Sequence, residues 1–200
     1  KNTIVVANLD SIDGLNASSS RGPAHDGRIK PDVAAVGTEV LSTRPDNTYE
    51  RSTGTSMSAP GVAGVLAQLY HAYESNNGGM TPDGGLMKCI LLNGADDIGN
   101  TGPDFKHGYG RVNAGKSIEI IEAAQHLDST IAQGNENVHQ ITVPANTQQL
   151  KVMINWVDFE ATAGALTALV NNLDMTVTDP NTTVYNPWVL DHTPNATTLD

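Results

Sequence analysis

Residues 54–64 read Gly-Thr-Ser-Met-Ser-Ala-Pro-Gly-Val-Ala-Gly and lead into an apolar segment that continues to Tyr73. Gln68 and His71 are the only strongly polar residues in that segment. A helix that is apolar around most of its circumference is typical of the middle of a domain, so the pattern predicts a buried central helix over 57–73. The Asn-Asn-Gly-Gly run that follows tolerates left-handed backbone and is expected to end it.

Ser56 stands at the predicted start of this helix. Backbone N–H groups of a first turn have no partner within the helix and the helix dipole is positive there, so the position favours negative charge developing on an oxygen. The small residues around it, such as Gly54 and Gly61, leave room for a substrate, and Pro60 costs little so early in a helix. The residues alone leave two interpretations open: Ser56 is a nucleophile, or it only caps a core helix.

The rest of residues 1–127 alternates short strands and helices. β-branched segments near 3–7, 33–36 and 39–42, separated by Gly and Pro turns, predict buried strands. Thr81-Pro82 is expected to cap and open a helix over about 82–93. Asn113 is expected to cap another, with an apolar face at Ile118, Ile121 and Ala124. The pattern is that of an α/β domain.

The character of the chain changes after Asp128. We interpret 128–137 as a linker and 138–200 as part of an antiparallel β-sandwich. The predicted strands are Val138 to Val143, Leu150 to Val157, 173–179 and 182–188, with Asp179-Pro180-Asn181 as the turn between the last two. Four strands are too few to close such a sandwich.

Composition excludes several classes of protein. Lys and Arg number 11 against 22 Asp and Glu, a net charge of −11, so nucleic-acid binding and attachment to an anionic membrane are disfavoured. Hydrophobic residues at 38% and charged residues at 16% indicate a packed core rather than disorder. The single cysteine, Cys89, cannot form an internal disulfide, and no paired zinc-ligand spacing is present.

Both ends of the sequence predict a piece of a longer polypeptide. Lys1-Asn2-Thr3 opens directly into the apolar run at 4–7 without a signal segment, and Thr198-Leu199-Asp200 stops within strand-like sequence.

Residues 54–64 closely resemble the active-site serine motif of the subtilisin-like serine proteases. Residues 18–23 (Ser-Ser-Ser-Arg-Gly-Pro) and 27–35 (Gly-Arg-Ile-Lys-Pro-Asp-Val-Ala-Ala) resemble the turn and strand before that motif. Residues 92–96 and 108–114 resemble the strand and final helix that close the catalytic domain. The resemblance implies that 1–127 is the C-terminal part of a subtilisin-like parallel-sheet domain. Val36 is a departure, because the family often has Pro before the glycine that follows.

The resemblance implies that Ser56 is the nucleophile and that Thr55 and the Ser56 backbone N–H lie at the oxyanion site. The family's Asp, His and oxyanion Asn all lie upstream of this sequence. His25 is the only histidine before Ser56, and it sits in a Pro-Ala-His-Asp-Gly turn without the family's His-Gly-Thr context. His71, His107, His126, His139 and His192 follow the serine, against the family's order.

Residues 150–158, 169–174 and 178–181 resemble the jelly-roll domain that follows the catalytic domain in some larger subtilisin-like proteases. Such domains can hold Ca²⁺, so a structural calcium site is expected to involve the oxygen-bearing residues Asp158, Asn171, Asn172 and Asp174, with turn formation as the alternative for each.

The resemblance predicts a secreted serine endopeptidase that acts on polypeptides and needs no catalytic cofactor. The partner of this chain is then the missing N-terminal part of the same catalytic domain, and the 200 residues alone are expected to be inactive. The alternative hypothesis is a pseudoprotease or a protein-interaction module without catalysis.

Overall fold

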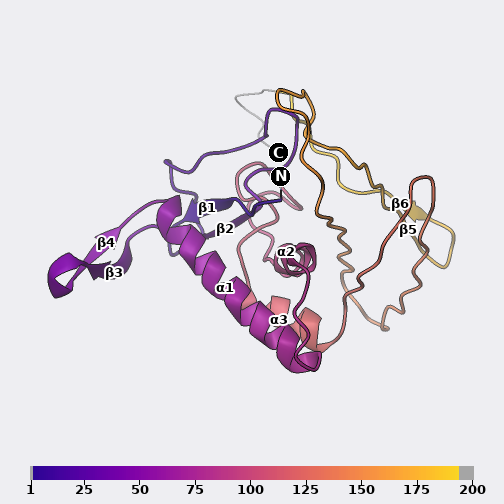
Figure 1. Cartoon of the computed structure of the whole chain (residues 1–200), viewed down its shortest axis with the longest axis horizontal. Helices are drawn as coiled ribbons and strands as arrows, with labels where there is room; N and C mark the ends of the chain where they lie inside the picture. Colours follow the sequence, from indigo (N-terminus) through magenta and orange to yellow (C-terminus); the bar gives the residue numbers. More distant parts are fainter. Residues whose placement is uncertain (1, 194–200) are drawn as a thin grey trace.

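The computed structural model describes residues 2–193. Its helices and strands follow one another as shown in Figure 1, in the order β1 (Val6–Leu9), β2 (Val33–Val36), β3 (Val40–Arg44), a short 3-10 turn (Pro45–Asn47), β4 (Thr48–Ser52), α1 (Thr55–Asn76), α2 (Gly84–Asn93), α3 (Ala114–Glu122), β5 (Val177–Thr178) and β6 (Val184–Tyr185). The α/β class predicted for the first part of the chain is confirmed, and the predicted strand 33–36 has the bounds of β2.

The parallel pair β1 and β2 forms the centre of the sheet. Val6 is the register partner of Val33 and Leu9 that of Val36. Residues 110–112 join the free side of β2, where the Ala34 N–H donates to the Gly110 carbonyl at 2.9 Å and the Val112 N–H donates to the Ala34 carbonyl at 2.9 Å. Ala7, Leu9, Val33, Ala34 and Ala35 of the first two segments are buried, as is typical of parallel strands covered by helices.

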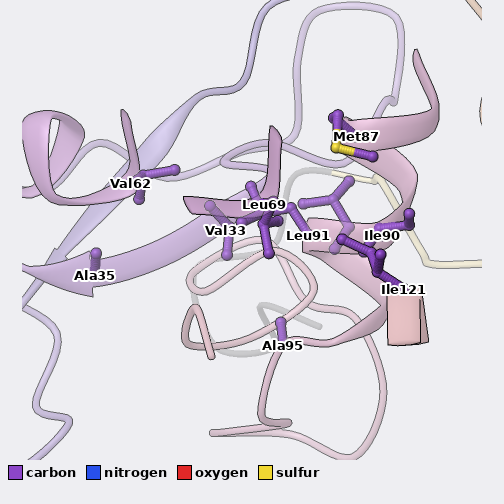
Figure 2. Close-up of a cluster of buried hydrophobic side chains, with 10 residues drawn as sticks. Val33, Ala35, Val62, Leu69, Met87, Ile90, Leu91, Ala95 and Ile121 are labelled. Carbon is purple, nitrogen blue, oxygen red and sulfur yellow. The ribbon is translucent and has the colours of Figure 1, made fainter. Parts of the chain in front are cut away.

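The hydrophobic core lies between β2 and the three helices of the described residues (Figure 2). Helix α1 contacts β1, β2, α2 and α3. The buried side chains of this core are Val33, Ala35, Val62, Leu69, Met87, Ile90, Leu91, Leu92, Ala95 and Ile121. These residues come from β2, the three helices and the loop after α2, so the core holds the serine helix against the sheet.

Burial of α1 around most of its circumference, expected from its sequence, is wrong for the described part of the chain. Only Ser58, Val62 and Leu69 are buried. The face opposite them is exposed and is formed by Ala59, Pro60, Gly61, Ala63, Gly64 and Ala67. Within residues 2–193 no element packs on this face, and a Cβ added at Gly61 or Gly64 would meet no atom within 4 Å. No helix in the same residues is both long and apolar enough to cross a bilayer.

Side chains cap the N-termini of α2 and α3. The Asn113 side chain accepts from the Lys116 N–H at 3.1 Å, as predicted. Thr81 is not the cap of α2; Asp83 is, and its carboxylate accepts from the Gly85 N–H at 2.7 Å. The prediction placed the start of α2 two residues early because both Thr81-Pro82 and Asp83-Gly84 are typical of a helix start. The structure uses the second of them, whose carboxylate is the stronger acceptor.

β3 and β4 form a hairpin that projects from the body of the molecule (Figure 1). The sequence analysis found β3 but missed β4, because Tyr-Glu-Arg-Ser at 49–52 has no buried face. Pro45 and the left-handed residues Asp46 and Asn47 make the turn between the strands. The second strand leads directly to the residues before α1.

The β-sandwich predicted for 138–200 is not found in its described part. Val138 to Val143 and Leu150 to Val157 are not strands, since no backbone hydrogen bonds join them to a neighbour. Only the two-residue strands β5 and β6 form within 173–188, around the predicted turn at Asp179. A strand requires a paired edge, and alternation of apolar residues does not supply one. Residues 194–200 of this prediction lie outside the described residues, and the boundary at 128–137 stays a prediction.

Residues 151–158 lie along α2 instead. The Lys151 ammonium donates to the Leu92 and Ala95 carbonyls at 3.4 and 3.3 Å, and the Asn155 amide donates to the Gly85 carbonyl at 2.9 Å. The side chains of Leu150, Val152 and Ile154 point to solvent and are 47%, 39% and 41% exposed. This segment therefore has one face on α2 and an apolar face in water.

Candidate active site

Ser56 is the second residue of α1 and is exposed. Gly54 precedes the helix with φ 159° and ψ 165°, and its carbonyl accepts from the Met57 N–H at 2.9 Å and the Ser58 N–H at 3.4 Å. The N–H groups of Thr55 and Ser56 have no acceptor within the helix, because the first turn has no preceding carbonyls. The predicted serine is thus at a solvent-facing helix N-terminus with free backbone donors.

The start of α1 is tied to the end of the parallel sheet. The Gly54 N–H donates to the Gly37 carbonyl at 2.9 Å, and the Gly37 N–H donates to the Leu9 carbonyl at 3.0 Å. Glu39 and Thr53 reinforce this junction, since the Glu39 N–H donates to the Thr53 hydroxyl at 3.0 Å. The hairpin β3–β4 therefore leaves the sheet and returns to it within a few residues of Ser56.

A buried polar cluster lies under the first turn of α1. Asn8 on β1 and Ser58 on α1 are both fully buried. A Cβ on Gly37 would overlap the Ser58 Oγ and would stand 2.5 Å from the Gly54 carbonyl oxygen and 2.8 Å from the Asn8 Oδ1. The Thr38 hydroxyl donates to that Oδ1 at 3.1 Å. The Ser58 Oγ and the Asn8 Nδ2 have no hydrogen-bond partner in residues 2–193.

The structure shows the surroundings of several described histidines. His25 is in an exposed turn, as predicted. His71 is fifteen residues further along α1, about 22 Å at the rise of a helix. His107 is paired with Asp104 through its Nδ1 at 3.0 Å. The ring centroid of His126 lies 5.5 Å from that of Tyr73. His192 packs against Gly27.

The buried pair of Asp104 and His107 has a structural role. Burial acts to raise the pKa of the carboxyl, but hydrogen bonds from the His107 side chain and from the backbone of His107 and Lys106 lower it below its ordinary value. Its Oδ1 accepts from those two N–H groups at 2.6 and 2.7 Å. The pair therefore organises the turn before Gly108 and offers no base to Ser56.

A second ionic cluster is buried under β2. The Asp32 carboxylate is within 2.5 Å of the Lys30 ammonium and within 3.1 Å of the Lys88 ammonium, and it accepts from the Val5 N–H at 2.7 Å. Desolvation lowers the pKa of Lys30, although Asp32 acts against it. The cluster joins the start of β2 to α2 and to the residue before β1, so its role is to hold the sheet on the helices.

The third ionic cluster closes the strand pairing at 110–112. Arg111 binds Asp13 at 2.7 Å and Asp96 at 2.9 Å, and Lys116 binds Asp96 at 2.7 Å. Burial acts to raise the pKa of Asp96, but the hydrogen bonds from Lys116, Arg111 and Asn113 lower it from 3.8 to about 2. The cluster around Asp32 and the cluster around Asp96 thus both position the elements that carry the serine helix.

The calcium site expected at Asp158, Asn171, Asn172 and Asp174 stays a prediction. Only two of the four come together: the Asn171 amide nitrogen donates to the Asp158 Oδ1 at 2.9 Å. The carboxylate of Asp158 also accepts from the N–H groups of Phe159, Val170 and Asn171 at 2.8–3.1 Å. Asn172 and Asp174 are exposed. In residues 2–193 no three His, Cys, Asp or Glu side chains group to hold a metal ion. The carboxylate of Asp158 organises the loop that ends at Asn171.

The sequence analysis missed Asn8, Gly37 and Ser58, which lie directly under the serine. Ser58 could have been found from its place two residues after Ser56, because a side chain at that spacing lies on a different face of the helix from an exposed residue. Gly37 follows a buried strand, as a glycine that meets another backbone often does. Nothing in the sequence pairs Asn8 with either, because 50 residues separate Asn8 from Ser58.

Comparison with known proteins identifies the family of the region that contains Ser56. The model described as the subtilase family matches residues 1–110. The chain is 45% identical over 131 residues to C5a peptidase of Streptococcus pyogenes, which covers 62% of this chain and 11% of that protein. It is 36% identical over 113 residues to pyrolysin of Pyrococcus furiosus, which covers 52% of this chain and 8% of that protein. The chain therefore spans about a tenth of the length of these curated relatives.

The fold agrees with that of solved relatives. The CspB protease of Clostridium perfringens matches with a TM-score of 0.54 and 31% identity over 60% of this chain and 26% of its own. The matched subtilase region contains β1, β2, α1 and α2, which are the elements that place Ser56. Because residues 1–110 are more than half of the 200, the chain belongs to the subtilase family.

Proposed function

We propose that this chain is the nucleophile-bearing part of a subtilisin-like serine endopeptidase and that Ser56 is its nucleophile. The observation that carries the proposal is the exposed hydroxyl of Ser56 at the N-terminus of α1, in a chain of the subtilase family. Ser56 is not the N-cap residue of α1, because Gly54 holds that position and Ser56 lies inside the first turn.

The chemistry follows from this geometry. A histidine base takes the proton of Ser56 Oγ while that oxygen attacks the carbonyl carbon of the scissile peptide bond. The carbonyl oxygen becomes an oxyanion, which the Ser56 N–H and the N-terminal dipole of α1 stabilise, with Thr55 beside them. The tetrahedral intermediate then releases the amine, which receives the proton from the histidine. Water attacks the acyl-enzyme in the same way and frees the carboxylic acid and Ser56.

The base and its aspartate, together with an asparagine donor for the oxyanion, are proposed to come from a further part of the same catalytic domain. Three of the described histidines are placed away from Ser56, since His71 is fifteen residues along α1, His107 is bound by Asp104 and His126 lies at Tyr73. The exposed small-residue face of α1 is the surface on which we propose that this part docks. Its glycines and alanines leave space for close approach of another backbone.

A leucine at Gly64 tests this docking. In the 200-residue chain a Cβ added at Gly64 meets no atom within 4 Å, and leucine gains about 0.8 kcal/mol of helix propensity over glycine, so stability should not fall. In a protein that contains the rest of the catalytic domain, the same side chain should prevent docking and abolish reaction at Ser56. Ser75→Leu, exposed near the far end of α1, is the control that should leave both unchanged. Equal activity of Gly64→Leu and the parent protein would contradict the docking face.

Fluorophosphonate labelling tests the function itself. The protein that includes the upstream sequence should be labelled at Ser56, as peptide mapping can show, and should cleave a casein substrate. Ser56→Ala should lose both, and Ser75→Ala should keep both. The 200 residues alone should label slowly, because they lack the base. Rapid labelling of the 200-residue chain would contradict the need for an added base, and an unlabelled longer protein would support a pseudoprotease instead.

We further propose that the protease is secreted and acts on polypeptides outside the cell. The support is the chain's place in the subtilase family. No cofactor is required for the steps above, since serine and the proposed histidine, aspartate and asparagine carry them. Immunodetection in culture supernatant against washed cells tests the location, and confinement to the cell interior would refute it.

A further inference from the structure

A serine and an asparagine, both fully buried, converge under the first turn of α1 without being paired. The Ser58 Oγ and the Asn8 Nδ2 are without hydrogen-bond partners in the described part of the chain. A buried polar group left unpaired costs about 1–3 kcal/mol, so each such group needs an explanation. An alanine at 58 would fill nearly the same space at no such cost.

The two side chains meet at Gly37. The position of a Cβ on Gly37 would overlap the Ser58 Oγ and would be 2.8 Å from the Asn8 Oδ1, so both oxygens lie around the same point. The Oδ1 of Asn8 already accepts from the Thr38 hydroxyl at 3.1 Å, and it has a second lone pair free for another donor. A small movement of the first turn of α1 would bring the Ser58 hydroxyl within bonding distance of it.

The rest of the cluster holds Asn8 still. The Asn8 N–H donates to the Ser19 hydroxyl at 3.1 Å and its carbonyl accepts from the Asn16 N–H at 2.9 Å. The Asn16 amide also donates to the Thr38 hydroxyl at 3.1 Å. Asn8 is therefore a fixed point on β1, whereas the start of α1 is held by few bonds. The Ser58 N–H reaches the Gly54 carbonyl only at 3.4 Å.

We infer that Ser58 and Asn8 are a positioning pair for the nucleophile: a hydrogen bond between the Ser58 hydroxyl and the Asn8 side-chain amide, direct or through one buried water, fixes the first turn of α1 when the protease is assembled. The inference rests on the proposed function and adds two residues to it that do not touch the substrate. Ser56 is two residues before Ser58 on a rigid helix, so the pair sets the position of the Ser56 Oγ and N–H relative to the sheet. Displacement of a reacting group by a fraction of an ångström is enough to lower kcat.

The test uses the complete protease and measures kcat and KM for a peptide substrate together with the rate of fluorophosphonate labelling. Ser58→Ala should lower kcat and the labelling rate about tenfold and leave KM within about twofold. Asn8→Ala should have the same effect. In the double variant the second substitution should add nothing further, because both remove one interaction.

Ser117→Ala is the matched control. Ser117 on α3 is also fully buried, and its hydroxyl donates to the Asn113 carbonyl at 2.9 Å. Its loss should lower Tm without changing kcat, which is what a purely structural serine does. Should Asn8→Ala fail to fold, Thr38→Val removes a bond to the Asn8 Oδ1 and should lower kcat in the same direction.

The outcomes separate the two proposals. Parent-like kcat in Ser58→Ala, or effects of the two substitutions that multiply, overturns the positioning pair and leaves the protease function intact. A parent protein that neither labels nor cleaves overturns the proposed function, and the positioning pair with it.

Discussion

The Gly54 N–H donates to the Gly37 carbonyl oxygen at 2.9 Å and so joins the residue before the serine helix to the end of the parallel sheet. Between the two lies only the hairpin β3–β4, which projects away from the body of the chain. The sheet therefore contacts the residue two positions before Ser56 directly, without the hairpin between them.

Gly37→Ala should disrupt this junction. A Cβ would overlap the Ser58 Oγ and stand 2.5 Å from the Gly54 carbonyl oxygen, so the start of α1 must shift. We expect a loss of about 1–3 kcal/mol in the free energy of unfolding, measured by urea denaturation with circular dichroism. Gly61→Ala, where the added methyl meets nothing, is the matched control and should be neutral or stabilising. Equal stability of the two variants would show that the junction is not tight.

Asp32→Ala should be among the most damaging substitutions outside the serine helix. It leaves the ammonium groups of Lys30 and Lys88 without the carboxylate that binds them at 2.5 and 3.1 Å. Removal of one partner of a buried pair costs about 3–5 kcal/mol. The expected result is a large fall in the urea midpoint. Lys88→Met, which takes a buried cation away, should cost much less, and the reverse order of the two variants would refute this account.

The free energy of unfolding should fall at acid pH, over a pH range set by the pKa of Asp96. Its pKa is about 2 in the folded chain against 3.8 ordinarily, because the bonds from Lys116, Arg111 and Asn113 outweigh burial. Because the Asp96 carboxyl has a lower pKa in the folded chain than in the unfolded chain, its ionised form stabilises the fold above about pH 4. That contribution is lost as the pH falls toward about 2. In urea titrations at several pH values, Asp96→Asn should be less stable than the parent at neutral pH, and the difference should shrink below pH 4. Asp46→Asn, exposed in the hairpin, should show no such change.

The thiol of Cys89 should resist alkylation in the folded chain. Burial raises its pKa to about 11, and its Sγ lies 3.6 Å from the Met153 carbonyl oxygen, which accepts from it. At pH 8 iodoacetamide should react about a hundredfold more slowly than with the same chain in guanidinium, because the thiolate is rare. Asn155→Ala, which removes the bond from residues 151–158 to the Gly85 carbonyl, should speed the reaction. No difference between folded and unfolded chains would show that this segment does not cover α2.

The capping residue of α2 can be assigned by two alanine substitutions. Asp83→Ala removes the acceptor of the Gly85 N–H and should cost about 1 kcal/mol in urea denaturation. Thr81→Ala should change stability by less than about 0.5 kcal/mol, because Thr81 lies outside the helix. The opposite ranking would restore Thr81 as the cap.

Local features were predictable from sequence because they depend on neighbours in the chain. The α/β pattern, β2, the span of α2, the Asn113 cap and the place of Ser56 at a helix start all follow from periodicity and from side chains that bind their own backbone. The family followed from residues 54–64 and their flanks, and the match over 1–110 confirmed it.

Features that require a partner far along the chain were not predictable. Leu150 to Val157 has the alternation of a strand, yet it lies on α2, because its pairing partner is decided by packing and not by its own side chains. The hydrogen bonds of the Asp158 carboxylate with the Asn171 amide and with backbone N–H groups were likewise not predictable, because the partners are distant in the chain.

By itself, then, the sequence determined the serine helix, its nucleophile candidate and the family, since these are written in contiguous residues. Only the tertiary structure decided what surrounds the serine: the junction of Gly37 with Gly54, the Ser58 Oγ and Asn8 Nδ2 that have no partner within residues 2–193, and the outer face of α1 that those residues leave uncovered. The physical reason is that close contacts between distant segments depend on shape complementarity, which no local pattern records.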